Sequence, residues 1–289
     1  MHNNIQMRKK LTIYSFALLG ILVLLNSCKK EYETIESIDD AKIQTYIKQN
    51  NLTMTKDPSG FYYQVVDQGT GDIMLNKDSV LYDFNIKSLT GVSYQAKNTN
   101  SNFGNYLGYI TPTPYRIALT NLKRGGSVKV IFPSYLAFGK NGSGNIPSNE
   151  VLISEISTYP QKTQWQLDDA RIVAFLAAKG ITATKDPSRV YYQVLTQGTG
   201  TDVIDQNSTL VVKYTGRLLD GTVFDSSTAF TTTLTGVIAG WGKVLPLFKS
   251  GAKIRIFIPS NLAYGASATG SIPQNSALDF DIEIVSVTN

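Results

Sequence analysis

Residues 212–227 have the sequence Val-Lys-Tyr-Thr-Gly-Arg-Leu-Leu-Asp-Gly-Thr-Val-Phe-Asp-Ser-Ser. Apolar side chains occupy every second position at Leu210, Val212 and Tyr214, a pattern that predicts a strand with one buried face. Asp220-Gly221 is a residue pair that favours a tight hairpin turn. The chain is therefore expected to return beside this strand as a second, antiparallel strand.

The same alternation recurs further along the chain, at Ile254, Ile256 and Ile258 and again at Phe280, Ile282 and Ile284. These runs predict an antiparallel sheet that is covered on a single side. The segment Ala239–Leu245, limited by Gly242 and Pro246, is the best candidate for a helix on the concave side of that sheet. The predicted fold class is α+β.

Three motifs of the second half of the chain repeat the first half at a constant offset of 129 residues. The repeated pairs are Asp39–Ile43 with Asp168–Ile172, Thr55–Ser59 with Thr184–Ser188, and Tyr62–Val65 with Tyr191–Val194. An offset of this length indicates two whole domains rather than a solenoid. We expect them to cover residues 38–159 and 166–289, joined by a linker at 159–166.

Each repeat is expected to open with an amphipathic helix. In the second copy, Asp168 is the predicted N-cap, Leu167 and Ile172 the hydrophobic staple, and Gly180 the end of the helix. In the first copy Asp39 takes the place of Asp168.

The N-terminus has the pattern of an export signal. Arg8, Lys9 and Lys10 precede an apolar run, Leu11–Leu25, that is short for a membrane-spanning helix. Leu-Asn-Ser-Cys, ending at Cys28, resembles a bacterial lipobox. It implies a signal peptide at 1–27, a lipid on Cys28 and a tether at 28–37. An uncleaved anchor and an ordinary secretory signal are the alternatives.

The composition excludes several kinds of active site. The 27 basic and 22 acidic residues give a net charge of +5, and without residues 1–27, which hold three basic residues and no acidic one, it is +2. That charge does not favour nucleic acid as a partner. The only histidine is His2 and the only cysteine is Cys28. A mature chain of this kind has no Ser-His-Asp triad, no Cys-His dyad and no ordinary zinc site, and we expect no cofactor.

Two more motifs follow the hairpin: Gly-Val-Ile-Ala-Gly-Trp at Gly236–Trp241 and Ile-Pro-Ser-Asn-Leu-Ala-Tyr-Gly at Ile258–Gly265. In this order and spacing, the series from about Tyr191 to Val287 resembles the FKBP-type peptidyl-prolyl cis-trans isomerases. The resemblance implies a half-barrel sheet wrapped round a short helix, a shallow apolar pocket and sensitivity to macrolide inhibitors. Matched motif by motif, it implies the catalytic residues Tyr214, Asp225, Trp241 and Tyr264 and the substrate-binding residues Phe224, Phe230, Val237, Ile238, Ile272 and Phe280.

The implied chemistry is consistent with the absence of histidine and metal ligands. Rotation of an X-Pro amide has a barrier of about 18–20 kcal/mol and moves no proton. A dry pocket that accepts the twisted amide better than the planar one is sufficient. Trp241 would lie under the prolyl ring, while the Ile238 N–H and the Tyr264 hydroxyl would hold substrate carbonyls. Asp225 would act electrostatically at the pocket edge.

Each of these residues also has a purely structural interpretation. Phe280 and Val237 are typical core residues, Trp241 could fill the barrel, and Asp225 could cap a turn. Tyr214 and Tyr264 could be ordinary sheet tyrosines with solvated hydroxyls. The functional interpretation depends on their occurrence together, in one order.

The first copy loses the polar members of this set and keeps its turns. Phe84 stands opposite Tyr214, Gln95 opposite Asp225, and Phe138 opposite Tyr264; Tyr115 replaces Trp241 and Pro112 replaces Ile238. A proline has no N–H to offer. We therefore predict the same fold in the first copy with little or no isomerase activity.

Two functions remain open from the sequence. The first is a prolyl isomerase that is lipid-anchored in the cell envelope, with catalysis in the second domain. It would act on proline-containing segments of exported proteins and assist their folding. The alternative is a peptide-binding chaperone or scaffold without catalytic activity. The oligomeric state, the clients and the role of the first domain are not encoded in any motif that we identify.

Overall fold

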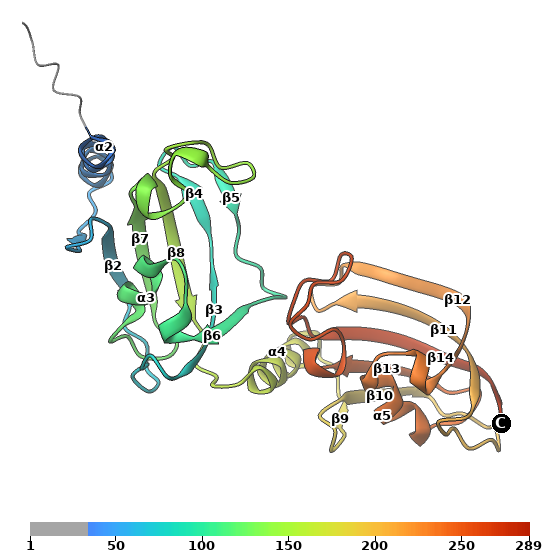
Figure 1. Cartoon of the computed structure of the whole chain (residues 1–289). Helices are drawn as coiled ribbons and strands as arrows, with labels where there is room; N and C mark the ends of the chain where they lie inside the picture. The colour runs from blue at the N-terminus through green and yellow to red at the C-terminus, as the bar shows by residue number, and fades with distance from the viewer. Residues whose placement is uncertain (1–33) are drawn as a thin grey trace, which may run out of the picture. The chain divides into compact units, whose positions relative to one another are not determined.

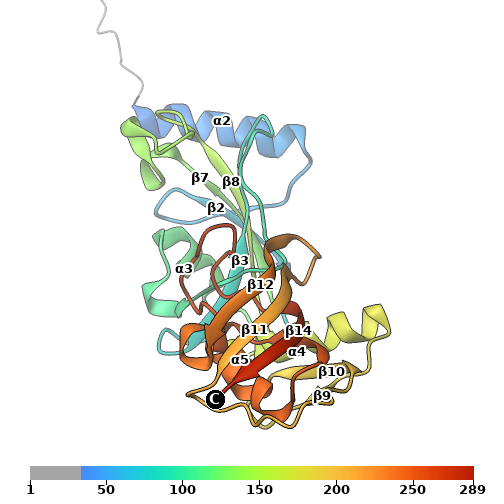
Figure 2. The same cartoon turned by 90° about the vertical axis from the view of Figure 1, so that its right-hand side faces the viewer.

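The structure, a computed structural model, describes residues 34–289 (Figures 1 and 2). Cys28 and the predicted signal peptide lie outside the described residues. Helices and antiparallel sheets occur together, which confirms the α+β class. In the part of the chain that the structure describes, no helix has both the length and the apolar character needed to cross a membrane.

The first half of the chain contains an eight-stranded sheet. Its strands run in the order β1-β2-β7-β8-β3-β6, and β4 pairs with both β5 and β8. The elements are α2 (Ile35–Gln49), β1 (Thr55–Lys56), β2 (Tyr62–Asp67), β3 (Ser79–Phe84), β4 (Ile86–Ser88), β5 (Ser93–Gln95), β6 (Phe103–Tyr106), α3 (Thr113–Leu119), β7 (Ser127–Phe132) and β8 (Leu152–Thr158).

The second half contains a six-stranded sheet in the order β12-β11-β14-β13-β10-β9. From β14 outward this is the order β8-β7-β2-β1 of the first sheet, so the repeated sequence gives a repeated topology. The elements are α4 (Gln164–Lys179), β9 (Thr184–Lys185), β10 (Tyr191–Thr196), β11 (Thr209–Leu218), β12 (Val223–Thr233), α5 (Ala239–Val244), β13 (Lys253–Ile258) and β14 (Leu278–Thr288).

The hairpin predicted from Asp220-Gly221 joins β11 to β12. Gly221 has a φ of +94°, a conformation that glycine adopts without steric cost. The register places Gly216 opposite Asp225 across the hairpin and opposite Phe280 on β14. Residues that are far apart in the sequence thus meet on neighbouring strands.

Helix α5 lies against one face of the six-stranded sheet, as the sequence predicts (Figures 1 and 2). Trp241 on this helix is 3% exposed and belongs to the same core cluster as Ile256, Ile258 and Phe280. At Gly240 an added Cβ would overlap the Ile258 side chain. The glycine therefore allows the helix to approach β13 closely enough to cover the core.

Helix α4 packs on the other face of the sheet, where Ile172 and Leu176 share a core cluster with Phe257 of β13. The predicted end at Gly180 is confirmed, with φ +63°. The predicted N-cap is wrong: the helix begins at Gln164, after Thr163, whose N–H donates to Gln166 Oε1 at 3.2 Å. The helix therefore starts at the capping box of Thr163 and Gln166, one turn before Asp168.

The first helix also begins before its predicted N-cap. It starts at Ile35, four residues ahead of Asp39, so the predicted tether at 28–37 overlaps its first turn. Both aspartates, Asp39 and Asp168, are fully buried inside their helices. Asp39 accepts hydrogen bonds from Ser134, which follows β7. Asp168 accepts hydrogen bonds from Ser260, which follows β13.

Candidate functional site

A cavity of about 400 Å³ opens between α5, the β11–β12 hairpin and the segment that follows β13. It contains all four predicted catalytic residues and most of the predicted substrate-binding residues. The residues that line it are Tyr214, Phe224, Asp225, Phe230, Thr235, Gly236, Val237, Ile238, Trp241, Tyr264 and Phe280.

The floor of this cavity is a set of aromatic rings in edge-to-face contact. The Trp241 ring lies 5.4 Å from the ring of Tyr214 and 5.3 Å from that of Phe280, with interplanar angles of 79° and 88°. Phe224 meets Phe280 at 5.5 Å, and Phe230 meets Tyr214 at 5.6 Å. Such contacts hold rings in fixed orientations. The result is a rigid apolar surface at the base of the cavity.

Tyr214 and Asp225 form the polar edge of the site. The Tyr214 hydroxyl donates to Asp225 Oδ2 at 2.6 Å, and the Ser226 N–H donates to Asp225 Oδ1 at 2.8 Å. Burial, followed by the interaction with Asp225, raises the pKa of Tyr214 to about 12. The tyrosine therefore stays protonated and holds the carboxylate at the rim of the cavity.

Tyr264 and Ile238 supply two further polar groups. The Tyr264 side chain is 39% exposed, and burial, followed by the charge of Asp225, raises its pKa. Ile238 precedes α5 with φ −58° and ψ 146°. No acceptor among the described residues takes its N–H. The site thus presents a hydroxyl and a backbone N–H to a ligand, both able to donate to a carbonyl oxygen.

Ile272 does not line the cavity, in contrast to the expectation from the sequence. It is 5% exposed and lies in the core cluster of the second half. Its backbone pairs with Thr269 in an isolated bridge that closes a tight loop. An apolar side chain in such a short loop is drawn into the core by the free energy of burial.

Sequence reasoning missed Thr235 and Gly236, which line the cavity from the turn before α5, and it missed the role of Gly216. A Cβ on Gly216 would lie 2.6 Å from Phe280 and 2.7 Å from Phe224. The two rings therefore occupy the space that a side chain at 216 would need. A glycine inside an otherwise regular strand was the available signal.

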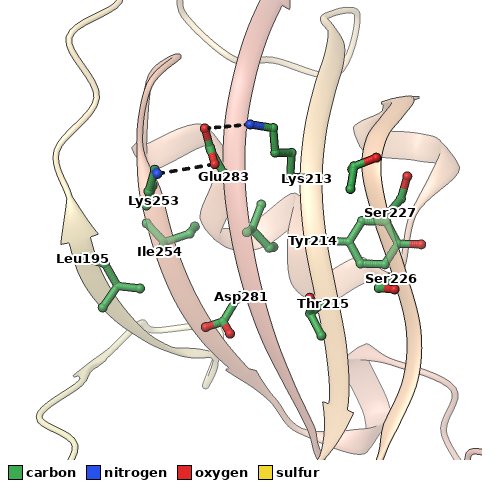
Figure 3. Close-up of a pocket in the computed structure, with 12 residues that line it drawn as sticks. Leu195, Lys213, Tyr214, Thr215, Ser226, Ser227, Lys253, Ile254, Asp281 and Glu283 are labelled. Carbon is green, nitrogen blue, oxygen red and sulfur yellow. Dashed lines mark hydrogen bonds and ion pairs between the residues drawn. The ribbon is translucent and has the colours of Figure 1, made fainter.

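A larger hollow of about 680 Å³ lies over the opposite face of the same sheet. Lys213 and Thr215 alternate with Tyr214 along β11 and so point to that face. Figure 3 shows Glu283 between Lys213 and Lys253 on neighbouring strands, with nitrogen–oxygen distances of 3.4 and 3.5 Å. This surface is open and charged, so its larger volume does not make it a better site for an apolar ligand.

The first half has a smaller cavity, of about 230 Å³, at the equivalent place. The residues that line it are Phe84, Ile86, Gln95, Pro112, Tyr115, Phe132, Ala137, Phe138 and Leu152. Ile86 pairs with Gln95 as Gly216 pairs with Asp225. A branched side chain therefore occupies the position that glycine leaves free in the second half.

The base of this smaller cavity is closed by hydrogen bonds. The Tyr115 hydroxyl lies 2.5 Å from Ser154 Oγ, which in turn donates to the Asn85 carbonyl. Tyr115 and Ser154 take the places of Trp241 and Phe280, because Ser154 pairs with Val130 as Phe280 pairs with Ile256. Burial raises the pKa of Tyr115, so its proton stays in this network.

In the part of the chain that the structure describes, no three His, Cys, Asp or Glu side chains are grouped so that they could hold a metal ion. The chemistry available to the cavity is the binding and orientation of an apolar ligand with carbonyl acceptors.

Residues 200–285 match the family model of the FKBP-type peptidyl-prolyl cis-trans isomerases. The FKBP-type peptidyl-prolyl cis-trans isomerase FkpA of Buchnera aphidicola subsp. Schizaphis graminum is 35% identical over 170 residues, which cover 51% of this chain and 65% of the relative. The outer membrane protein MIP of Legionella longbeachae is 38% identical over 124 residues, 41% of this chain and 52% of the relative.

A solved peptidyl-prolyl cis-trans isomerase from Pseudomonas syringae pv. tomato is 34% identical and aligns with 44% of this chain and 94% of its own, with a TM-score of 0.39. The chain spans less than two thirds of the length of the two curated relatives.

Proposed function

Because residues 200–285 form a domain of the FKBP-type peptidyl-prolyl cis-trans isomerase family, we propose that this chain catalyses cis–trans isomerisation of X-Pro bonds in polypeptides. The reaction takes place in the cavity of about 400 Å³ that Trp241 floors. The observation that carries the proposal is the convergence of an apolar aromatic floor with two carbonyl-binding donors in one cavity.

The aromatic floor lowers the barrier through the electrostatics of the amide. Twisting the C–N bond ends its conjugation and shrinks the amide dipole, so an apolar environment favours the twisted state relative to water. The prolyl ring lies on Trp241, with Phe224 and Phe280 as walls beside it. The enzyme stabilises the transition state more than either planar isomer, which is the requirement for a higher rate.

The polar groups hold the peptide on both sides of the rotating bond. The Ile238 N–H and the Tyr264 hydroxyl donate hydrogen bonds to substrate carbonyls, so one end of the peptide is fixed while the other turns. The Tyr214 hydroxyl, 2.6 Å from Asp225 Oδ2, orients the Asp225 carboxylate. This carboxylate lies at the edge of the cavity, beside the carbonyl of the amide that rotates.

Catalysis is confined to the second half in this proposal. The first half supplies Phe138 where Tyr264 stands, Gln95 where Asp225 stands and Pro112 where Ile238 stands. Its cavity has lost the donors and almost half of its volume. We assign it a peptide-holding or spacing role.

The sharpest test transplants residues of the first half into the second within the full chain. Tyr214→Phe, Asp225→Gln and Tyr264→Phe install the side chains that the first half has at Phe84, Gln95 and Phe138. The shape of the pocket is retained and the polar atoms change. With about 1 kcal/mol lost per hydrogen bond, kcat/KM of a proline-limited peptide assay should fall about 100-fold.

The matched control is Tyr115→Phe, which removes the hydroxyl at the base of the first cavity. We expect it to leave the turnover unchanged, because that cavity does not catalyse. An unaltered chain that shows no turnover would disprove the proposed activity. A triple variant with full turnover would show that these three polar side chains take no part in the reaction.

For the location, we propose a lipid anchor on Cys28 in the bacterial cell envelope, facing exported proteins whose folding the enzyme assists. The lipobox resemblance supports it, as does the name of the Legionella longbeachae relative, an outer membrane protein. Cys28→Ser should release the protein from the membrane fraction. Retention of the substituted protein, with lipid still attached, would refute the anchor.

A second candidate function is the holding of unfolded chains without turnover. The apolar cavity of the first half, lined by Phe84, Tyr115 and Phe138, favours it. The two functions separate in a refolding assay with a proline-free client, where only holding has an effect. Competition by a macrolide, which we expect for the cavity floored by Trp241, would reduce proline-dependent turnover alone.

A further inference from the structure

The turn that carries Tyr264 is tied to helix α4 by one buried carboxylate. Asp168 is 0% exposed and Ser260 is 1% exposed. Asp168 Oδ2 accepts hydrogen bonds from the Ser260 N–H at 2.8 Å and from the Ser260 hydroxyl at 2.6 Å. These bonds join residues 92 positions apart in the sequence. They fix Ser260 at the point where the chain leaves β13.

Ser260 in turn fixes the backbone on both sides of Tyr264. Its carbonyl accepts the N–H of Ala263 at 2.9 Å and the N–H of Gly265 at 2.8 Å. Gly265 has a φ of +65°, so the turn reverses directly after the tyrosine. The position of the Tyr264 Cα is thus set by two hydrogen bonds to a single residue, and Asp168 holds that residue.

The second oxygen of this carboxylate is also engaged, and here the two halves of the chain differ. Asp168 Oδ1 accepts from Gln164 Nε2 at 2.8 Å. Asp39 in the first half makes the same pair of bonds to Ser134, at 2.8 and 2.6 Å, but its Oδ1 is buried without a hydrogen bond. The nearest cation, Lys42 Nζ, lies 3.7 Å away.

We propose that Asp168 is a positioning residue for the isomerase reaction: through Ser260 it holds the Tyr264 hydroxyl where a substrate carbonyl binds. The inference depends on the proposed function for its effect on turnover. Asp168 itself contacts no substrate. The same link in the first half holds a turn that carries Phe138, which has no hydroxyl to position.

The experiment compares Asp168→Ala with Asp39→Ala in the full chain. Both remove the acceptor of a buried serine, so both should lower the stability of their own half. Only Asp168→Ala should lower kcat/KM, by about tenfold, because a misplaced binding group loses its contribution to orientation. Asp168→Asn retains an acceptor for Ser260 and should restore most of the activity.

A double-mutant cycle separates positioning from a general loss of structure. In a Tyr264→Phe chain the hydroxyl is absent, and Asp168→Ala should then cause no further loss of kcat/KM. Equal losses in the two backgrounds, or an equal loss in Asp39→Ala, would overturn the proposal.

Hydrogen exchange gives a readout that does not need turnover. Asp168→Ala should accelerate the exchange of the Ala263 and Gly265 amides, whereas Asp39→Ala should not. Unchanged exchange at both amides would overturn the proposal. If the unaltered chain turned over no substrate, the proposed function would fail, and this measurement would still decide whether Asp168 holds the turn. If Asp168→Ala did not fold, kcat/KM and the exchange of the Ala263 and Gly265 amides would be measured on Ser260→Ala and Asp168→Asn instead, and would decide whether Asp168 holds the turn.

Discussion

At residue 238 the second half of the chain has a backbone hydrogen-bond donor that the first half lacks. Ile238 has a backbone N–H that no described acceptor takes, and the first half has Pro112 at the same place. The Ile238 φ of −58° lies where proline is fixed, and the preceding residue is extended, with φ −126° and ψ 169°. The backbone would therefore accept proline without rearrangement.

Ile238→Pro consequently tests the N–H with little change in the fold. We expect kcat/KM to fall about tenfold, the loss of one substrate hydrogen bond of about 1.4 kcal/mol. The midpoint of urea unfolding should stay close to that of the unaltered chain. The check is a proline-limited peptide assay beside urea titrations, with Pro112→Ile as the control that leaves turnover unchanged. Full activity in Ile238→Pro would show that the Ile238 N–H takes no part in the reaction.

Helix α5 contains two glycines, Gly240 and Gly242, and only Gly240 packs too closely against the sheet to accept a side chain. A Cβ on Gly240 would overlap the Ile258 side chain, whereas a Cβ on Gly242 would meet only the Leu234 carbonyl, at 3.8 Å. Gly240→Ala should lower the free energy of unfolding by about 1–3 kcal/mol through overpacking. Gly242→Ala should raise it by up to about 1 kcal/mol, because alanine is the better helix former.

Denaturant titration of the two variants measures this difference. In an Ile258→Ala background the obstacle is gone, and Gly240→Ala should then be neutral or stabilising. A cost that persisted there would show that Ile258 does not limit the approach of α5 to β13.

Periodicity and turn chemistry predicted the elements themselves. The hairpin at Asp220-Gly221, the helix from Ala239 and the helix end at Gly180 are confirmed. The starts of α2 and α4 were wrong, because a helix start depends on which polar group finds a partner. Asp168 is engaged by Ser260, 92 residues away, a contact that no local pattern encodes.

The candidate site, too, was predicted only in part. The residues that the family resemblance implies line the cavity from strands, from α5 and from the turns beside them, except Ile272, whose tight loop turns it into the core. The importance of Gly216 depends on two aromatic rings from other strands. Such an effect follows from three-dimensional packing and is not visible in the pattern of one strand.

The helix that opens each repeat, α2 or α4, is joined to its sheet by an ion pair that the sequence repeats. Asp40 of α2 accepts hydrogen bonds from Lys56 at 2.5 Å and from Tyr62 at 2.8 Å. Asp169 of α4 does the same with Lys185, at 2.6 Å, and Tyr191, at 2.8 Å. Partial burial opposes the ionisation of Asp40, but the bonds from Lys56 and Tyr62 outweigh it and lower its pKa.

The stability that Asp40 contributes should therefore depend on pH. Its pKa is lower in the folded chain than in the unfolded one, so its contribution is present above the unfolded value of 3.8 and is lost as the pH falls through the folded value. Asp40→Asn should lower the stability at about pH 7 by less than about 1 kcal/mol, since the pair is largely exposed. At about pH 2 the variant and the parent should converge in urea titrations. A difference that remained there would indicate a packing effect.

At the scale of the whole molecule, the two halves share one topology and differ in the chemistry of one cavity. The first half closes its cavity with Ile86 and the Tyr115–Ser154 hydrogen bond, and the second opens it with Gly216 and the aromatic pair Trp241 and Phe280. In the proposed function, the chain combines one catalytic cavity with one that holds a peptide or acts as a spacer.

The composition of the whole chain also determines how turnover should vary with pH. The only histidine, His2, lies in the predicted signal peptide. Burial and then Asp225 raise the pKa of Tyr214 to about 12, and burial raises that of Tyr264, so both hydroxyls keep their protons. Amide rotation requires no proton transfer. We expect kcat/KM to stay constant within about twofold between about pH 6 and about pH 9. A peptide assay over this range, with a circular dichroism spectrum at each pH as the control for folding, measures it. A bell-shaped profile in a chain that remains folded would mean that an acid or a base takes part, and rotation assisted only by an apolar cavity would then be the wrong mechanism.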